Sequence, residues 1–262
     1  MKALILAAGR GSRLLSYSRR RPKCLLEVGG HAILDYQIAA LRRCGIHDIV
    51  IVVGYLANCI KDHVTVPVTF VENRDYASTG SSYSLWLAME LVRDGFIYLN
   101  SDLVFDPLML RQLIDDPEPN AVIVDRRVDP AGDMLKAEMD GRLILSTGKR
   151  LAVPAAAEVV GPAKIGPAGA RRVEERLDRL VGAGDRNRWV YEVLGLVAPE
   201  IGLAGVDNPG CFWCEVDTPA DAWDANQRIP PSLVRMADLE GSAGARRPRL
   251  LAVGSQSGHV LD

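Results

Sequence analysis

The stretch KALILAAGRGSRLLSYSRRRPKCLLEV, residues 2–28, decides the fold class of this chain of 262 residues. It begins with a short continuous apolar run at residues 2–8, the pattern of a strand buried on both faces of a parallel sheet. A turn with Gly9 and Gly11 follows. In open α/β sheets such a turn lies at the carboxyl end of the first strand, where ligands bind. Glycine lets main-chain N–H groups approach phosphate oxygens closely, so the stretch predicts a phosphate-binding turn.

Beyond this stretch, strand and helix patterns alternate along the chain. Buried apolar runs predict strands at residues 48–53, 66–71, 96–100 and 121–124. Helical spacing of apolar residues predicts helices at residues 34–44, 56–62, 82–93 and 108–114. This alternation predicts βαβ crossovers in an α/β protein, with a mostly parallel central sheet and helices on both faces.

The later part of the chain carries turn and linker signals. Asp140-Gly141 between apolar segments predicts a hairpin. A surface helix is predicted at residues 168–181, a late strand at 211–216, and a helix at 219–228. We therefore expect a first domain at residues 1–228. A linker and the start of a truncated following domain are expected at residues 229–262.

Composition excludes several classes of protein. Hydrophobic residues make up 48% and charged residues 24%, which excludes a wholly disordered chain. A formal net charge of −2 argues against a dedicated nucleic-acid or membrane-surface binder. No apolar run approaches the roughly 20 residues that span a bilayer. Five cysteines in a chain large enough to build its own core indicate reduced thiols and a cytoplasmic protein.

The glycine turn fits neither of two common nucleotide-binding motifs. A dinucleotide fingerprint requires glycine where this chain has Leu14, and a Walker loop requires a GKS or GKT that is absent. Cations cluster instead between the turn and the next apolar segment: Arg10, Arg13, Arg19, Arg20, Arg21 and Lys23. Fixed cations suit the charge of a triphosphate and of departing pyrophosphate. A solvated basic loop or a nucleic-acid patch is the alternative, but these cations flank a phosphate-type turn rather than form a separate stripe.

Two aspartates follow predicted strands. Asp102 comes after the strand at residues 96–100, and Asp217 follows the late strand at 211–216. Mg²⁺ prefers a few carboxylates together with phosphates and waters, so the two could hold one Mg²⁺ between a triphosphate and an acceptor. An aspartate in either position alone is more often a turn residue or a helix cap than a metal ligand.

The pair LAAGRGSRL (residues 6–14) and RPKCLLEVGG (residues 21–30) resembles the signature of nucleotidyltransferases that join an NTP to a phosphorylated acceptor. Residues 72–88 and the segments LSTGKRL (145–151) and FWCEVDTPADAWDAN (212–226) narrow the resemblance. The body at residues 1–228 is similar to the cytidylyltransferases that activate phosphocholine and small phosphonates. The resemblance implies a Rossmann-like three-layer sandwich of nucleotidyltransferase type. It also implies Mg²⁺-dependent transfer of CMP from CTP, with release of pyrophosphate.

The same resemblance implies roles for individual residues. Lys23 would contact the α-phosphate, Arg13 the β- and γ-phosphates, and Asp102 with Asp217 the Mg²⁺. The implied nucleotide-binding residues are Ala7, Ala8, Gly9, Gly11, Gly80, Ser81 and Ser82. The implied acceptor-binding residues are Lys149, Tyr83 and Tyr191. One departure is that relatives often have two asparagines where this chain has Gly80-Ser81. Gly80 could therefore be a plain turn residue, and Tyr83 a core residue.

The acceptor is less clearly indicated. Residues 249–258 resemble the opening of a phosphoenolpyruvate mutase, which follows a fused cytidylyltransferase in fosfomycin-type pathways. That favours 2-hydroxyethylphosphonate as acceptor and a fused mutase domain. Phosphocholine, held by an aromatic cage, and sugar 1-phosphates are alternatives. A non-catalytic nucleotide-binding module and a homodimer are compatible with the same sequence.

Overall fold

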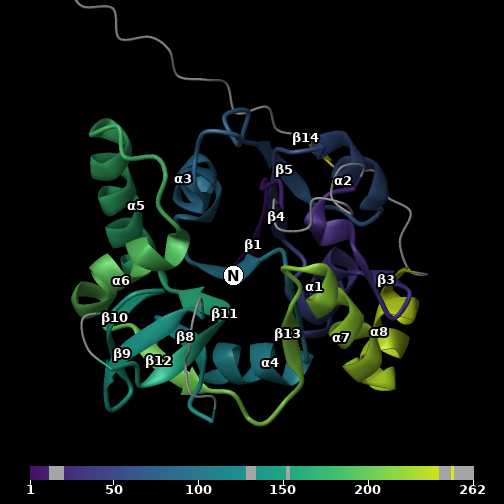
Figure 1. Cartoon of the computed structure of the whole chain (residues 1–262). Coiled ribbons are helices and arrows are strands. Elements are labelled where there is room, and N and C mark those ends of the chain that lie inside the picture. Colours follow the sequence, from purple (N-terminus) through teal and green to yellow (C-terminus); the bar gives the residue numbers. More distant parts are fainter. Residues whose placement is uncertain (12–20, 128–133, 152–153, 242–248, 251–262) are drawn as a thin grey trace, which may run out of the picture.

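The computed structural model describes residues 1–11, 21–127, 134–151, 154–241 and 249–250. Within them, ten strands form one sheet (Figure 1). One half holds β1 (Lys2–Ala7), β4 (Ile49–Val53), β5 (Thr69–Glu72), β6 (Phe96–Asn100) and β14 (Arg249–Leu250). The other half holds β8 (Ala121–Asp125), β9 (Lys136–Asp140), β10 (Leu143–Gly148), β11 (Ala157–Ile165) and β12 (Ala204–Asp207). The order is β14-β5-β4-β1-β6-β11-β8-β12-β10-β9.

The first half of the sheet is parallel, and the second half is mixed. Strand β1 lies between β4 and β6 and pairs with both in parallel, Ile5 opposite Ile51 on one side and Leu99 on the other. Strand β11 is antiparallel to both β6 and β8, while β8 and β12 are parallel. The predicted hairpin forms between β9 and β10, with Gly141 at a φ of +58° in its turn. The predicted three-layer α/β class is confirmed, and the antiparallel strands gather in its second half.

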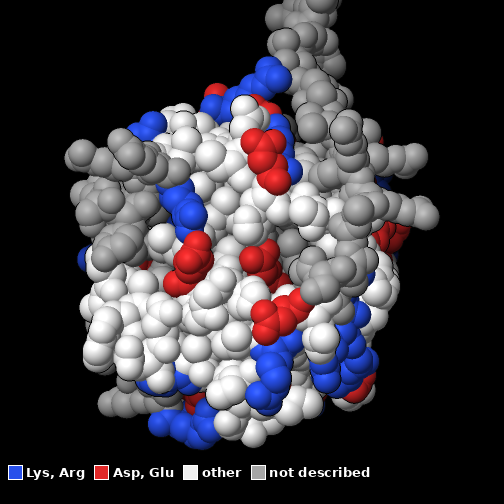
Figure 2. All heavy atoms as spheres, turned by 90° about the vertical axis from the view of Figure 1, so that its right-hand side faces the viewer, with Lys and Arg blue, Asp and Glu red and all other residues white. Residues whose placement is uncertain are grey.

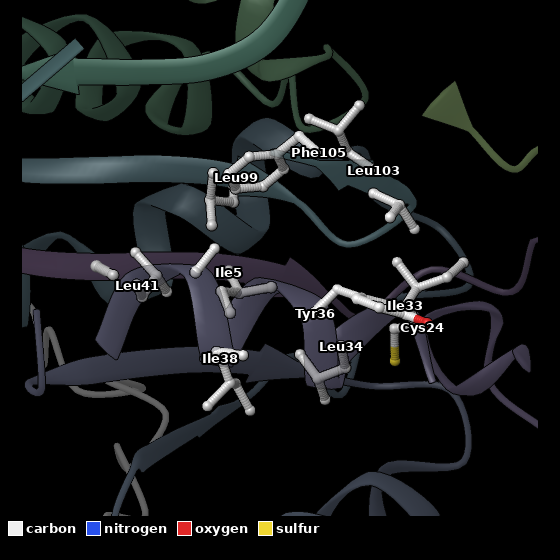
Figure 3. Packing of buried hydrophobic residues seen from close by; sticks show 14 of the residues in the cluster. Ile5, Cys24, Ile33, Leu34, Tyr36, Ile38, Leu41, Leu99, Leu103 and Phe105 are labelled. Atoms are coloured by element: carbon white, nitrogen blue, oxygen red, sulfur yellow. The ribbon is translucent and has the colours of Figure 1, made fainter. Parts of the chain in front are cut away.

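Helices cover both faces of the sheet. One face carries α3 (Ser81–Val92), α5 (Pro167–Gly182) and α6 (Val190–Ile201). The other carries α1 (Ile33–Arg43), α2 (Ala57–His63), α4 (Pro107–Asp115), α7 (Pro219–Arg228) and α8 (Pro231–Gly241). Alternate residues of β1 enter opposite cores: Ile5 packs with the α1 side and Leu4 with the α3 side. Figure 3 shows Ile5, Leu41 and Phe105 in the first of these cores.

A second pair of strands brings distant parts of the chain together. The predicted late strand forms as β13 (Trp213–Glu215), but it pairs antiparallel with β7 (Leu103–Phe105) instead of joining the main sheet. Next to this pair, the Val216 N–H donates to the carbonyl of Asp102 over 3.0 Å. The segments that carry Asp102 and Asp217 therefore lie side by side.

Strand β11 and helix α6 were not predicted from the sequence, because both contain residues that usually interrupt such elements. Strand β11 carries Gly161-Pro162, and its pairing with β8 shifts register between Val159 and Ala163. Helix α6 carries Gly195 and Pro199. Gly195 is needed there because a Cβ would lie 2.7 Å from the backbone nitrogen of Thr147 on β10. Close packing of the helix on the sheet thus requires a residue that lowers helix propensity.

Helix α8 lies beyond the predicted boundary at residue 228. Helix α8 packs against α1, and its Leu233, Met236 and Ala237 are buried in the same core as Ile5. The division at residue 228 stays a prediction.

On the face formed by α1, α7 and α8, acidic side chains lie centrally with basic side chains mostly around them (Figure 2). In the part of the chain that the structure describes, no helix combines the length and apolar character that crossing a bilayer requires.

Candidate active site

Lys23 joins the two predicted acids. Its ammonium donates to Asp102 Oδ2 over 2.8 Å and also to Asp217 Oδ1. The Lys23 side chain is 12% exposed, and those of Asp102 and Asp217 are 25% and 26% exposed. Asp102 and Asp217, which are 79 and 194 residues from Lys23 in sequence, thus meet it in one partly buried cluster. The cation of the glycine-rich segment and both strand-end acids share one rim.

Neighbouring residues hold these acids in place. Gln37 of α1 is fully buried, and its Nε2 donates to the carbonyls of Asn100 (2.6 Å) and Leu103 (2.8 Å) on either side of Asp102. On the other segment, Asp221 accepts the N–H groups of Asp217 (3.0 Å) and Thr218 (2.7 Å). Thr218 caps α7 in return, as its sequence position predicted. The acids therefore stand on fixed backbone, which suits a site that must position charge.

The charges of this cluster shift the pKa of its members. Burial alone would lower the pKa of Lys23, but Asp102 and Asp217 outweigh that effect and raise it. Burial, and then the charges of the same two aspartates, raise the pKa of Glu215 above its ordinary value. Lys23 is accordingly held as an ammonium at neutral pH.

A cavity of about 520 Å³ opens over this cluster. The predicted site residues that line it are Ala8, Gly9, Gly11, Lys23, Gly80, Ser81, Asp102, Lys149, Tyr191 and Asp217. Three others, Ala7, Ser82 and Tyr83, are buried but are not among its lining. Arg13 lies outside the described residues. The roles assigned to all of these residues stay predictions.

One end of the cavity is organised by Asn73, which the sequence analysis did not assign to the site. Asn73 is 1% exposed; its Nδ2 donates to Thr79 Oγ1 (3.1 Å) and Ser84 Oγ (3.0 Å). Its Oδ1 accepts the N–H of Asp75 over 2.9 Å, which fixes the loop between β5 and α3. Tyr76 and Thr79 of this loop line the cavity beside the glycine turn. An asparagine in a turn-rich segment directly after a strand was the available signal.

Arg10 lies at the same end of the cavity. Its guanidinium carbon is 5.9 Å from the ring centre of Tyr55 and 5.5 Å from that of Tyr76. Cation–π contacts with both rings hold this cation where the glycine turn meets the loop after β5.

Further lining residues of the cavity are aromatic. Lys149 lies just after β10, and its Nζ is 4.4 Å from the ring centre of Trp189. Tyr191 packs edge-on against Tyr98, with ring centres 5.5 Å apart, and both line the cavity together with Glu215. Tyr83 instead stacks on Trp86, with ring centres 5.4 Å apart, so its placement does not favour the predicted contact with an acceptor.

Gly80 allows two loops to touch at the rim of the cavity. The Gly80 N–H donates to the carbonyl of Arg186 (2.7 Å), and the Ser82 N–H donates to that of Arg188 (3.1 Å). A Cβ at position 80 would lie 2.3 Å from the carbonyl oxygen of Arg188. That distance explains why this chain has glycine there.

Gly80→Ala is expected to lower the free energy of unfolding by about 1–3 kcal/mol, since overpacking must displace backbone. Urea unfolding measures this, and Gly182→Ala is the matched control. No atom lies within 4 Å of a Cβ at Gly182, at the end of α5, so that control should be neutral or slightly stabilising. Equal stabilities of the two variants would contradict the close approach.

The acids also fit a divalent cation. Asp102 Oδ1 is buried and has no hydrogen-bond partner, while Oδ2 of the same group faces Lys23. Among the described residues, no set of three or more His, Cys, Asp or Glu side chains is arranged around a common metal position. Two carboxylates at a cavity rim suit Mg²⁺, which takes one or two carboxylates and completes its shell with phosphates and waters.

Comparison with known proteins shows which proteins this sequence is similar to. The family model described as MobA-like NTP transferase domain matches residues 3–191. The chain is 31% identical to a CMP-5'-(3-aminopropyl)phosphonate synthase of Streptomyces rubellomurinus, over 93% of this chain and 41% of that protein. It is 35% identical to a choline-phosphate cytidylyltransferase of Streptococcus pneumoniae, over 43% of this chain and 50% of that protein. The chain thus spans half or less of these two curated relatives.

Solved structures show the same fold. An inositol-1-phosphate CTP transferase from T. maritima superposes with a TM-score of 0.71 at 21% identity, covering 94% of this chain and 98% of that one. The likeness extends over both halves of the sheet, including the mixed half, in which strand β11 was not predicted from the sequence.

Proposed function

Because the chain belongs to the family of MobA-like NTP transferase domains, we propose that it is a Mg²⁺-dependent cytidylyltransferase. It would transfer CMP from CTP to a small phosphonate or phosphomonoester and release pyrophosphate. The observation that carries this proposal is the meeting of Lys23, Asp102 and Asp217 at the rim of one cavity with the glycine turn. The relatives named as a CMP-phosphonate synthase and a choline-phosphate cytidylyltransferase support the choice of CTP.

The reaction is a displacement at phosphorus. An oxygen of the acceptor's phosphonate or phosphate forms a bond to the α-phosphorus of CTP, and the bond from that phosphorus to the bridging oxygen of pyrophosphate breaks. The acceptor oxygen is already ionised near neutral pH, so no side chain must remove a proton. Catalysis then consists of positioning and charge neutralisation.

The residues have separate tasks in this scheme. Lys23 binds the α-phosphate and neutralises charge as pyrophosphate departs, and Arg13 binds the β- and γ-phosphates. Asp102 and Asp217 hold the Mg²⁺, which when bound supplies Lewis-acid neutralisation of phosphate oxygens. Lys149, held beside Trp189, faces the acceptor's phosphonate.

The acceptor that the sequence favours is 2-hydroxyethylphosphonate. Glu215 favours a second candidate, an acceptor with a positively charged amine, because this acid lines the cavity beside Tyr98 and Tyr191. A bound ammonium group would favour the ionised form of this acid, whose pKa is raised in the free site by burial and then by Asp102 and Asp217, and the neighbouring rings suit the same cation. The compounds in the names of two relatives, 3-aminopropylphosphonate and choline phosphate, also carry a positively charged nitrogen.

A matrix of four NTPs against 2-hydroxyethylphosphonate, 2-aminoethylphosphonate, phosphocholine and glucose 1-phosphate tests the proposal by pyrophosphate release. We expect turnover with CTP and at least one of the first three acceptors. Glu215→Gln separates the two candidates: it should slow transfer to an amine-bearing acceptor while transfer to the hydroxyl-bearing one is retained. Turnover only with glucose 1-phosphate would indicate a sugar-phosphate nucleotidyltransferase. CTP binding without turnover would indicate a nucleotide-binding module.

A further inference from the structure

The Lys23 ammonium occupies the space where the two acids converge. It contacts one oxygen of each aspartate, and all three side chains are largely removed from solvent. An ammonium and a divalent cation cannot share the same carboxylate oxygens at contact distance, because their like charges repel strongly where water is scarce. As long as Lys23 stays in this position, the acid pair already has a counter-ion.

The backbone under Lys23 is held in place, so a change of partner involves its side chain. Lys23 begins the short 3-10 turn Lys23–Leu25, in which Cys24 and Leu25 are buried. Its stem packs directly against the glycine turn: a Cβ at Gly11, whose φ is +61°, would lie 3.1 Å from Lys23 Cβ. The lysine that closes the acid pair is therefore in contact with the turn expected to receive the triphosphate.

We propose that Lys23 closes the Asp102–Asp217 pair to divalent cations until a triphosphate draws its ammonium away, so that the metal enters together with the nucleotide. This inference rests on the proposed function for the identity of the nucleotide. A triphosphate offers the ammonium several anionic oxygens in exchange for two carboxylates. The carboxylates then lose the Lys23 counter-ion, and a divalent cation can bind between them and the phosphates. Nucleotide and metal are thereby coupled through one side chain.

Equilibrium dialysis with Mn²⁺, in the absence of nucleotide and acceptor, tests the inference on the whole chain. Wild type should bind Mn²⁺ weakly, and Lys23→Met should bind it about tenfold more tightly or better. Lys23→Arg, which retains the charge, should remain as weak as wild type. The matched control is Lys61→Met, because Lys61 pairs with Glu72 over 2.9 Å and does not line the cavity. Lys61→Met should bind Mn²⁺ as weakly as wild type does.

Two further measurements identify the site and the coupling. Asp102→Asn in the Lys23→Met background should abolish the gained Mn²⁺ binding. Adding CTP to wild type should retain Mn²⁺ beyond the amount bound by CTP alone.

Equal Mn²⁺ affinity of wild type and the folded Lys23→Met variant would overturn the inference, and so would tight binding by Lys23→Arg. The outcomes separate from those of the proposed function. A gain in Lys23→Met without any CTP turnover by wild type leaves the counter-ion role standing and removes the cytidylyltransferase. CTP turnover by wild type without a gain in Mn²⁺ binding by Lys23→Met would remove the counter-ion role and leave the cytidylyltransferase standing.

Discussion

Lys23→Met is expected to lower kcat/KM for CTP by about 10³-fold, a loss typical of removing a cation that stabilises transferring phosphate. The reason is geometric: Lys23 is held at the cavity rim between Asp102 and Asp217, where the α-phosphate is expected. Steady-state pyrophosphate release at saturating Mg²⁺ and acceptor measures the effect. The same variant should bind Mn²⁺ more tightly, so metal affinity and turnover should change in opposite directions.

The control for this loss is again Lys61→Met, which should retain wild-type turnover. Removing Lys23 leaves two neighbouring carboxylates without their shared cation, so the stability of the variant must be measured by urea unfolding under the assay conditions. Unchanged pyrophosphate release by a folded Lys23→Met protein would show that the α-phosphate is bound elsewhere.

Asp102→Asn should lower turnover by about 10²- to 10³-fold and raise the Mg²⁺ concentration needed for half-maximal rate. The amide keeps the shape of the Asp102 side chain but removes the negative charge that faces Lys23. It also replaces one of the two carboxylate oxygens, of which Oδ1 is buried, with nitrogen. A titration of rate against Mg²⁺ at saturating CTP measures both effects.

Asp106→Asn is the matched control, only four residues away. Asp106 caps α4 by accepting the N–H of Leu108 over 2.9 Å. Asparagine caps helices about as well as aspartate, so this variant should keep both its stability and its Mg²⁺ dependence. If the two variants respond alike to Mg²⁺, Asp102 has no special relation to the metal.

The site residues that lie next to a strong local pattern could be predicted from the sequence, but other residues that line the cavity could not. The glycine turn, Lys23 and the strand-end acids were recognised because each lies next to a strong local pattern. Asn73 and Glu215 were missed as site residues because nothing local distinguishes a buried polar residue that lines a cavity from one that satisfies a turn. Tyr83 stacks on Trp86, and its predicted role at the acceptor stays a prediction. The face to which a helix residue points depends on its neighbours in the fold.

The parallel half of the sheet and the glycine turn after β1 were determined by the sequence alone, because short apolar runs, glycine turns and amphipathic helices are encoded within a few residues. Only the tertiary structure decided strand β11 and helix α6 in the second half, where Gly161 and Gly195 serve close packing and so weaken the local signal. It also decided that Asp102 and Asp217 share Lys23, through the pairing of β7 with β13. Contacts between residues more than a hundred positions apart depend on the packing of whole layers, which no local pattern contains.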